Sequence, residues 1–447
     1  MEANVMNDRM PVGIDDFQKV REGYYFVDKT DFIKDLIDSH GEVTLLIRPR
    51  RFGKTLTMSM LDWFFSAEKE KESRELFQGL HIASDGAGYM KHRGQYPVIF
   101  LTLKGVQNDT WQSLYDSFCL LMQSEYERHD YLLKGSLLKP SEQAYYRRIL
   151  DLTGSEADYQ VSLLYLSHYL RRYYDRKTII LIDEYDAPIQ CAYDHGFYDK
   201  AISYFRIWFN NALKSNASLA FAVLTGVLRI AKESIFSGLN NLKVCSVMTR
   251  MYADVMGFTP YEIKKMAQDL AMEGALSDIQ AWYDGYHFGD QDIYNPWSVI
   301  NFFDQKVLDD YWINTSGNSI LNQLMLSLSD EKQQDLISLL RGESISAMIR
   351  EGIIYDEIGN DEDALYTMLL TTGYLTPISC EKAFGGYWCK LVIPNREIQK
   401  VWKYGISFCG KKIWAQCKTL WDFGFRTYDA RLKSMIFRNR YSSSAIP

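Results

Sequence analysis

The chain has 447 residues, of which 47% are hydrophobic and 24% are charged, as in an ordinary folded protein. This length allows more than one hydrophobic core, so two or three domains are expected. The net charge of −7 excludes a general binder of polyanions, and the longest apolar run, 217–228, is too short and too polar to span a bilayer.

The cysteines and the first residues indicate the compartment. The seven cysteines are an odd number and include no Cys-x-x-Cys pair. This pattern argues against a disulfide framework or a zinc ribbon and favours a reducing compartment. Residues 1–10 contain no apolar stretch of the kind that a signal peptide needs. We therefore expect a cytoplasmic protein that does not bind a membrane.

In chain order, the first distinctive feature is a strand, a basic loop and a helix. The strand is expected over 43–47, the loop reads Arg-Pro-Arg-Arg-Phe-Gly-Lys-Thr over 48–55, and an amphipathic helix is expected over 56–65. This order is the layout of a phosphate-binding P-loop, or Walker A motif. The alternative is a basic turn before an ordinary helix, because Arg48 stands where the usual pattern has glycine.

The chemistry of the loop suits a nucleoside triphosphate with Mg²⁺. Gly53 lets the backbone approach the phosphates, Lys54 is expected to reach the β- and γ-phosphates, and the Thr55 hydroxyl is expected to hold Mg²⁺. The N-terminus of the helix adds partial positive charge. The expected nucleotide-binding residues of the loop are Arg50, Arg51, Phe52, Gly53, Lys54 and Thr55.

A second feature supports the first. After a strand at 97–103 and helical regions near 110–128 and 158–174, an apolar run at 178–182 leads into Asp183-Glu184-Tyr185-Asp186. A continuous apolar run is typical of a buried parallel strand, and ligands bind beyond the carboxyl ends of such strands. This is the Walker B arrangement, in which Asp183 holds Mg²⁺ and Glu184 acts as general base. The alternative is a buried strand followed by a solvated acidic turn.

A third strand end adds candidate residues. A helix near 198–214 precedes a strand at 219–224, and Thr225 follows at its end, where it can sense the γ-phosphate or the attacking water. Arg229 and Lys232 lie just beyond, and either could neutralise charge on the transferred phosphoryl group or be a solvated loop cation. We favour Arg229. Alternating strands and helices predict an α/β fold with a mainly parallel sheet flanked by helices.

The second half of the chain is less specific. Residues 233–257 are expected to be rich in loops. Thr259 and Glu262 form a capping box, and Pro296 marks the first turn of a further helix. The aromatic residues at 282–288 could line a binding surface, but packing between short helices is the simpler interpretation.

With these motifs identified, the chain resembles the bacterial AAA-ATPase-like family, in which an ATPase domain precedes a nuclease-like domain of the PD-(D/E)XK type. The matching segments include 11–14, 25–30, 48–55 and 181–188. Further matching segments are 224–241, 282–286 and 294–297. An arginine-rich loop in place of the first glycine is usual in this family, so the resemblance accounts for Arg48.

The resemblance implies three regions. They are an AAA-like P-loop ATPase domain at 1–257, a helical lid or linker at 258–345, and a small α+β region at 346–447 with an incomplete nuclease-like C-terminus. The nuclease-like part should begin near 391–397, yet only Asp422 and Asp429 supply acids after Glu397, and no Glu-x-Lys element follows. Residues 404–408 resemble that domain's last strand, arriving early. An internal deletion or frameshift after about 401 would explain this, and nuclease activity is not expected.

The sequence thus predicts an ATP-binding protein that acts as a Mg²⁺-dependent ATPase, coupling nucleotide state to a protein or nucleic-acid partner. The alternative is a nucleotide-gated binding module with little or no hydrolysis. The residues after Glu397 carry ten Lys or Arg and two Asp, a balance that could touch nucleic acid non-specifically. An oligomer is possible.

Overall fold

The computed structural model describes residues 8–84, 87–230, 235–236, 238–312, 330–350, 352 and 361–408. The chain divides into two compact units. The first consists of Met1–Arg48 and Gly53–Met256, and the second consists of Pro49–Phe52 and Gly257–Pro447. Four residues of the basic loop are therefore grouped with the second unit, although the chain on both sides of them belongs to the first.

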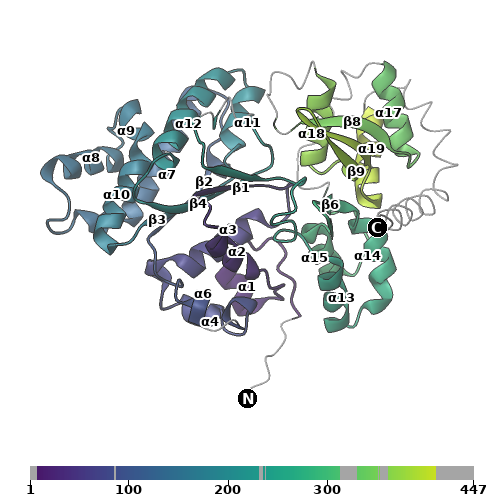
Figure 1. Cartoon of the computed structure of the whole chain (residues 1–447), viewed down its shortest axis with the longest axis horizontal. Coiled ribbons are helices and arrows are strands. Elements are labelled where there is room, and N and C mark those ends of the chain that lie inside the picture. Colours follow the sequence, from purple (N-terminus) through teal and green to yellow (C-terminus); the bar gives the residue numbers. More distant parts are fainter. Residues whose placement is uncertain are drawn as a thin grey trace. The chain divides into compact units, whose positions relative to one another are not determined.

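A five-stranded sheet forms the centre of the first unit (Figure 1). Its strand order is β2-β3-β4-β1-β5, and all of its neighbouring strands are parallel. The strands are β1 (Val43–Ile47), β2 (Val98–Thr102), β3 (Thr178–Asp183), β4 (Leu219–Gly226) and β5 (Leu242–Cys245). Every residue of β1 and β3 is buried, which explains their continuous apolar sequences. The predicted α/β fold with a parallel sheet is confirmed.

Helices cover both faces of this sheet. Figure 1 shows α1 to α3 on one face and α7, α10 and α12 on the other. The longer helices are α1 (Phe17–Gly23), α2 (Asp31–Ser39), α3 (Lys54–Phe65), α7 (Trp111–Arg128), α8 (Pro140–Leu150), α10 (Ser162–Tyr174), α11 (Ala187–Asp194) and α12 (Tyr198–Leu213). The short ones are η1 (Ala67–Lys69), α4 (Ser73–Leu76), α5 (His81–Ser84), α6 (Ala87–Met90), η2 (Leu103–Gly105), η3 (Asp130–Leu133) and α9 (Glu156–Gln160).

The structure corrects several local predictions for this unit. Helix α3 is not amphipathic, because every residue from Thr57 to Phe65 is buried. The passage at 233–257 contains β5, a four-residue strand that pairs with β1 at the edge of the sheet. Helices α8 and α11 were not predicted either. A short segment such as β5 has too few residues to show a period of its own, so only the neighbouring strand decides its conformation.

The second unit begins with short helices and a hairpin. These are α13 (Pro260–Asp269), η4 (Glu273–Ala275), α14 (Leu276–Tyr283), β6 (Tyr286–Phe288), β7 (Gln291–Ile293) and α15 (Pro296–Gln305). The predicted capping box is present: Thr259 Oγ1 accepts from the Glu262 backbone N–H at 3.3 Å, and Glu262 Oε2 accepts from the Thr259 N–H at 2.7 Å. Pro296 opens α15 as predicted, with the Asn295 side chain as the cap.

A three-stranded antiparallel sheet, in the order β8-β10-β9, follows in the second unit. Its elements are α17 (Asp330–Leu340), β8 (Ile345–Arg350), α18 (Glu362–Thr371), β9 (Thr376–Ala383), β10 (Gly386–Val392) and α19 (Arg396–Phe408). Because α19 continues to Phe408, the expected strand at 404–408 is wrong. Asp422 and Asp429, the two acids of the tail, lie outside the described residues.

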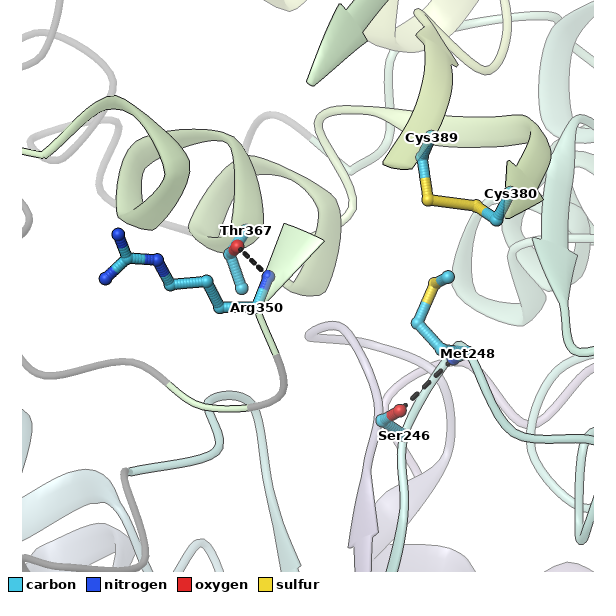
Figure 2. The surroundings of a disulfide bond; sticks show 6 residues. All are labelled: Ser246, Met248, Arg350, Thr367, Cys380 and Cys389. Carbon is cyan, nitrogen blue, oxygen red and sulfur yellow. Dashed lines mark hydrogen bonds between the residues drawn. A yellow bond between two sulfur atoms is a disulfide. The ribbon is translucent and has the colours of Figure 1, made fainter. Parts of the chain in front are cut away.

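The sheet of the second unit carries a disulfide. Cys380 and Cys389 face each other across β9 and β10 and are joined, as Figure 2 shows. In the same view the Arg350 backbone N–H donates to Thr367 Oγ1 at 2.9 Å, which joins the end of β8 to α18. The cysteine pattern argues against a disulfide framework, yet this pair is joined. Among the described residues, no helix is long and apolar enough to cross a bilayer.

Candidate active site

The carboxyl ends of three neighbouring strands meet at one edge of the parallel sheet. Strand β4 lies between β1 and β3, with Ile47 opposite Gly226 and Ile182 opposite Leu224. Backbone hydrogen bonds continue past the strand ends, from Arg48 N–H to Gly226 O at 3.1 Å and from Tyr185 N–H to Thr225 O at 2.9 Å. The segments after β1, β3 and β4 are thereby held side by side.

Asp183 is the point on which two of these segments converge. Its side chain is fully buried at the end of β3. The Thr55 hydroxyl donates to its Oδ2 at 2.7 Å, and the Thr225 hydroxyl donates to its Oδ1. One carboxylate therefore receives a hydroxyl from the start of α3 and another from the end of β4. The structure brings together three residues that are far apart in the chain and that the sequence analysis assigned to one site.

The loop before α3 has the backbone of a tight turn. Gly53 has φ of +85° and Arg51 has φ of +69°, both in the left-handed region. A Cβ built on Gly53 would meet no atom within 4 Å, so glycine is favoured there by its backbone conformation and not by crowding. The buried Lys54 donates from Nζ to the Arg48 carbonyl at 3.2 Å, which spans the loop from its last residues to its first.

Arg48, the residue in place of the usual glycine, is a buried anchor. Its guanidinium donates to the carbonyls of Ile47 at 2.8 Å, Cys245 at 3.0 Å and Tyr252 at 2.6 Å. These bonds tie the ends of β1 and β5 to the segment near Tyr252. Burial lowers the pKa of Arg48 to about 10, so the side chain remains charged at neutral pH. Arg48 is therefore engaged with backbone carbonyls of the protein and is not a candidate phosphate ligand.

The middle of the loop packs within the second unit. The Phe52 side chain is 1% exposed, and its ring lies 5.1 Å from that of Tyr286 and 5.4 Å from that of Phe288 between centroids. The Arg51 guanidinium lies 4.3 Å from the Trp297 ring centroid. The Phe52 side chain is occupied by this packing. If Phe52 binds a nucleotide as predicted, it must do so through its backbone N–H group.

The Arg50 carbonyl is held by a hydrogen bond, which the indole N–H of Trp312 donates to it at 3.3 Å. The Arg50 side chain is exposed. Aromatic residues from the 282–288 and 294–297 motifs thus pack around the loop, which agrees with packing as the simpler interpretation of those motifs.

Glu184 follows Asp183 directly and is only partly exposed. Its φ of +51° places it in the left-handed region, an uncommon conformation for a side chain of this size. Burial raises the pKa of its carboxyl, the charge of Lys54 opposes this shift, and the charges of Asp183 and Asp186 reinforce it. A raised pKa suits a group that takes up a proton during a reaction.

The remaining sequence candidates lie beyond β4. Arg229 is half-buried. Burial raises the pKa of Tyr185 well above its usual value, and the charge of Arg229 opposes this shift, so the two residues are neighbours. Lys232 lies outside the described residues. Hydrogen bonds thus connect Thr55 and Thr225 to Asp183. Arg229 is connected to this group through the backbone of the turn that follows Thr225.

The sequence analysis missed two buried residues of this region, Tyr185 and Asp186. Asp186 is 3% exposed, and its Oδ2 accepts the backbone N–H groups of Val227 at 2.9 Å and Leu228 at 2.7 Å. The sequence signal that could have identified Asp186 is its place as the second acid after β3. An acid buried so close to Asp183 needs donors, which the sequence does not identify.

The donor set fits a hard cation that is completed by phosphate. The described residues include no group of three or more His, Cys, Asp or Glu side chains that could hold a metal ion. Asp183 and Thr55 instead offer one carboxylate and one hydroxyl. Mg²⁺ characteristically binds through one or two carboxylates together with phosphate oxygens and water, so this pair suits a nucleotide-bound Mg²⁺ better than a free one.

The family model described as "Predicted AAA-ATPase" matches residues 11–236, about half of the chain. A protein of Azotobacter chroococcum mcd 1, described as an uncharacterized protein in the vnfD 5′ region, is 29% identical over 320 residues. The alignment covers 71% of this chain and 56% of that protein, so the chain spans little more than half of its relative's length.

Proposed function

The chain belongs to the predicted AAA-ATPase family, and from this premise we propose that it binds ATP with Mg²⁺ and hydrolyses it. One observation carries the proposal: the hydroxyls of Thr55 and Thr225 both donate to the buried carboxylate of Asp183. A Walker A hydroxyl, a Walker B carboxylate and a polar residue at the end of the next strand have this relationship when they share a metal and a phosphate chain.

The loop and its lysine bind the phosphates in this proposal. Backbone N–H groups over Arg50–Gly53 and the first turn of α3 face the anion, and the helix N-terminus adds partial positive charge. Lys54 moves its Nζ from the Arg48 carbonyl to the β- and γ-phosphates. Its replacement is expected to weaken binding because no backbone group supplies a full positive charge.

Thr55 and Asp183 hold Mg²⁺, which when bound neutralises charge on the phosphate oxygens. Glu184 orients the attacking water and accepts its proton. Its raised pKa makes the carboxyl a better base once it is ionised, and Lys54 keeps a positive charge nearby that favours the ionised form. Thr225 orients the γ-phosphate or the water from the end of β4, and Arg229 is the candidate for stabilising charge on the transferred group.

We further propose that the second unit responds to the nucleotide. Four residues of the phosphate-binding loop, Pro49–Phe52, pack within that unit, so a change in their backbone on ATP binding reaches it directly. Such a device couples nucleotide state to a protein or nucleic-acid partner.

The test is Mg²⁺-dependent phosphate release from ATP, measured together with ATP binding. Lys54→Ala is expected to lose both, and Glu184→Gln is expected to keep binding while losing turnover by about 100-fold or more. Exposed residues offer matched controls: Lys264→Ala on α13 and Glu127→Gln on α7 should leave both measurements unchanged.

The same experiment separates the alternative. A wild-type protein that binds ATP in a Lys54-dependent way but releases no phosphate is a nucleotide-gated binding module. A wild-type protein that neither binds nor hydrolyses ATP would refute the proposal.

A further inference from the structure

The buried residues after Glu184 hold the turn that follows Thr225. Asp186 Oδ2 accepts the backbone N–H groups of Val227 and Leu228, at 2.9 Å and 2.7 Å. The Tyr185 hydroxyl donates to the Leu228 carbonyl at 2.7 Å and accepts the Ile230 N–H at 3.2 Å. Two consecutive side chains thus fix the backbone of 227–230 through four hydrogen bonds.

Burial keeps the side chains of Tyr185 and Asp186 bound to the backbone of 227–230. Tyr185 is 0% exposed and Asp186 is 3% exposed, so neither side chain exchanges these partners for water. Asp186 is also the residue before α11, yet its side chain makes no cap for that helix. A buried carboxylate is stabilised by donors, and the Val227 and Leu228 N–H groups that donate to its Oδ2 belong to the turn and not to its own helix.

Gly226 shows how closely these elements approach. A Cβ at this position would lie 2.5 Å from Tyr185 Cε1 and 2.7 Å from Asp186 Oδ1, closer than real contacts allow. The absence of a side chain at 226 therefore lets Tyr185 and Asp186 reach the backbone beyond it. The glycine after Thr225 has a packing reason that is separate from any ligand.

The turn connects two candidate residues of the site. It begins after Thr225, whose hydroxyl donates to Asp183, and it contains Arg229. We infer that Tyr185 and Asp186 are positioning residues, which set the backbone of 227–230 so that Arg229 faces the transferred phosphoryl group. The inference rests on the proposed ATPase function. In this proposal the acids at the end of β3 have two roles. Asp183 binds the metal, and Asp186 positions Arg229 through the backbone of the turn.

The role predicts a specific kinetic pattern. Arg229→Ala is expected to lower kcat by about 100-fold or more, the usual loss when a positioned donor to the transition state is removed. Asp186→Ala is expected to lower kcat by at least about tenfold with ATP affinity changed less than about threefold, because its effect passes through Arg229. Asp186→Asn keeps an oxygen acceptor for the two N–H groups and should restore most of kcat.

Tyr185→Phe is the second variant, in case Asp186→Ala fails to fold. It removes only the hydroxyl that binds Leu228 and Ile230, and it leaves the ring in place. Both variants are expected to speed amide hydrogen exchange in 227–230 while leaving exchange in α3 unchanged. A role that is merely structural would instead raise exchange throughout the first unit.

The deciding measurement is a double-mutant cycle for kcat. In the Arg229→Ala background, Asp186→Ala and Tyr185→Phe should have no further effect if they act through Arg229. Losses that multiply would overturn the inference, as would Arg229→Ala with normal kcat or Asp186→Ala that weakens ATP binding as much as it lowers kcat.

Failure of the proposed function has a different signature. A wild-type protein without Lys54-dependent ATP binding would refute the ATPase and, with it, the positioning role. A wild-type ATPase with multiplying losses would refute the positioning role alone.

Discussion

Arg48 Nη1 donates to the carbonyl oxygen of Cys245 at 3.0 Å, across 197 positions of the chain. The contact joins the first residue of the basic loop, 48–55, to the end of the edge strand β5. It gives a structural reason for an arginine where the common loop pattern has glycine. The buried guanidinium of Arg48 anchors the start of the loop, and the proposed phosphate binding rests on the residues that follow.

We predict that Arg48→Gly, which restores the common loop pattern, destabilises the first unit. Removing the guanidinium leaves the carbonyls of Cys245 and Tyr252 without this donor, at a cost of about 1–3 kcal/mol for each buried group that remains unsatisfied. Urea unfolding should show a lower midpoint. The control is a pair of methionine variants, Arg48→Met and Arg147→Met, the second at an exposed arginine of α8. Methionine replaces glycine in this comparison because glycine would itself destabilise the helix at 147. Equal midpoints for these two variants would contradict the anchoring role.

Gly53→Ala tests the conformation of the loop. Its φ of +85° is unfavourable for alanine by about 1–2 kcal/mol, and no neighbouring atom would clash with the new Cβ. The loop should therefore shift, and ATP affinity is expected to fall by about tenfold, the change that 1.4 kcal/mol produces. Gly274→Ala is the matched control, since it also meets open space but has no left-handed φ. Unchanged ATP affinity in Gly53→Ala would argue against phosphate binding by this turn.

Thr225→Val tests the hydroxyl at the end of β4. Valine has the shape of threonine, but it cannot donate to Asp183, so the buried carboxylate loses one of its two hydroxyl partners. We expect kcat to fall by about tenfold or more, since removal of a positioned donor usually costs more than this. Thr225→Ser should retain most of the activity because it keeps the hydroxyl. If the serine and valine variants behave alike, the hydroxyl has no role.

The ion cluster of Glu68 and His129 predicts how stability depends on pH. Burial opposes ionisation of Glu68, but bonds from His129 and Arg128 outweigh it and lower its pKa from 4.5 to about 2. Its contribution is therefore present above pH 4.5 and is lost as pH falls toward 2. Burial likewise opposes protonation of His129, and its contacts with Glu125 and Glu68 outweigh this and raise its pKa above 6.5.

The His129 contribution is present below pH 6.5 and is lost as pH rises through its folded-state pKa. We expect the free energy of unfolding of the first unit to be greatest between these limits. Glu68→Gln should reduce the pH dependence of stability on both the acidic and the neutral side, because Glu68 and His129 stabilise each other's charged forms. A pH profile identical to that of wild type would exclude the cluster as their source.

Glu397 is expected to show the opposite pH dependence of stability from Glu68. Burial raises its pKa from 4.5 to about 8, against the bonds that it accepts from the Trp312 N–H at 2.8 Å and from Ser298 Oγ. The folded state holds the extra proton, so stability is greatest below pH 4.5 and falls as pH rises toward 8. Glu397→Gln mimics the neutral form and should flatten this dependence in thermal unfolding. The exposed Glu381→Gln should not, and a profile that stays steep in Glu397→Gln would contradict the assignment.

Local features of the chain were largely predictable from the sequence. The buried strands at 43–47 and 178–183, the glycine before α3 and the capping box at Thr259 are each specified within a few neighbouring residues. The strand, turn and helix around the basic loop could be predicted despite Arg48, because they are consecutive in the chain. Asp183 and Thr225 followed from one rule, that parallel strands place their carboxyl ends at one edge, and Thr55 followed from the Gly-Lys-Thr of the P-loop pattern.

The tertiary structure alone decided the partners of the buried polar groups. The carbonyls that bind Arg48, the turn held by Asp186 and the pairing of Cys380 with Cys389 depend on segments that folding brings together. It also decided that Phe52 packs with Tyr286 and Phe288 and that residues 404–408 continue a helix. The physical reason is that local sequence fixes backbone conformation and hydrophobic period, whereas a buried charge or hydroxyl is satisfied by whichever distant group the fold places beside it.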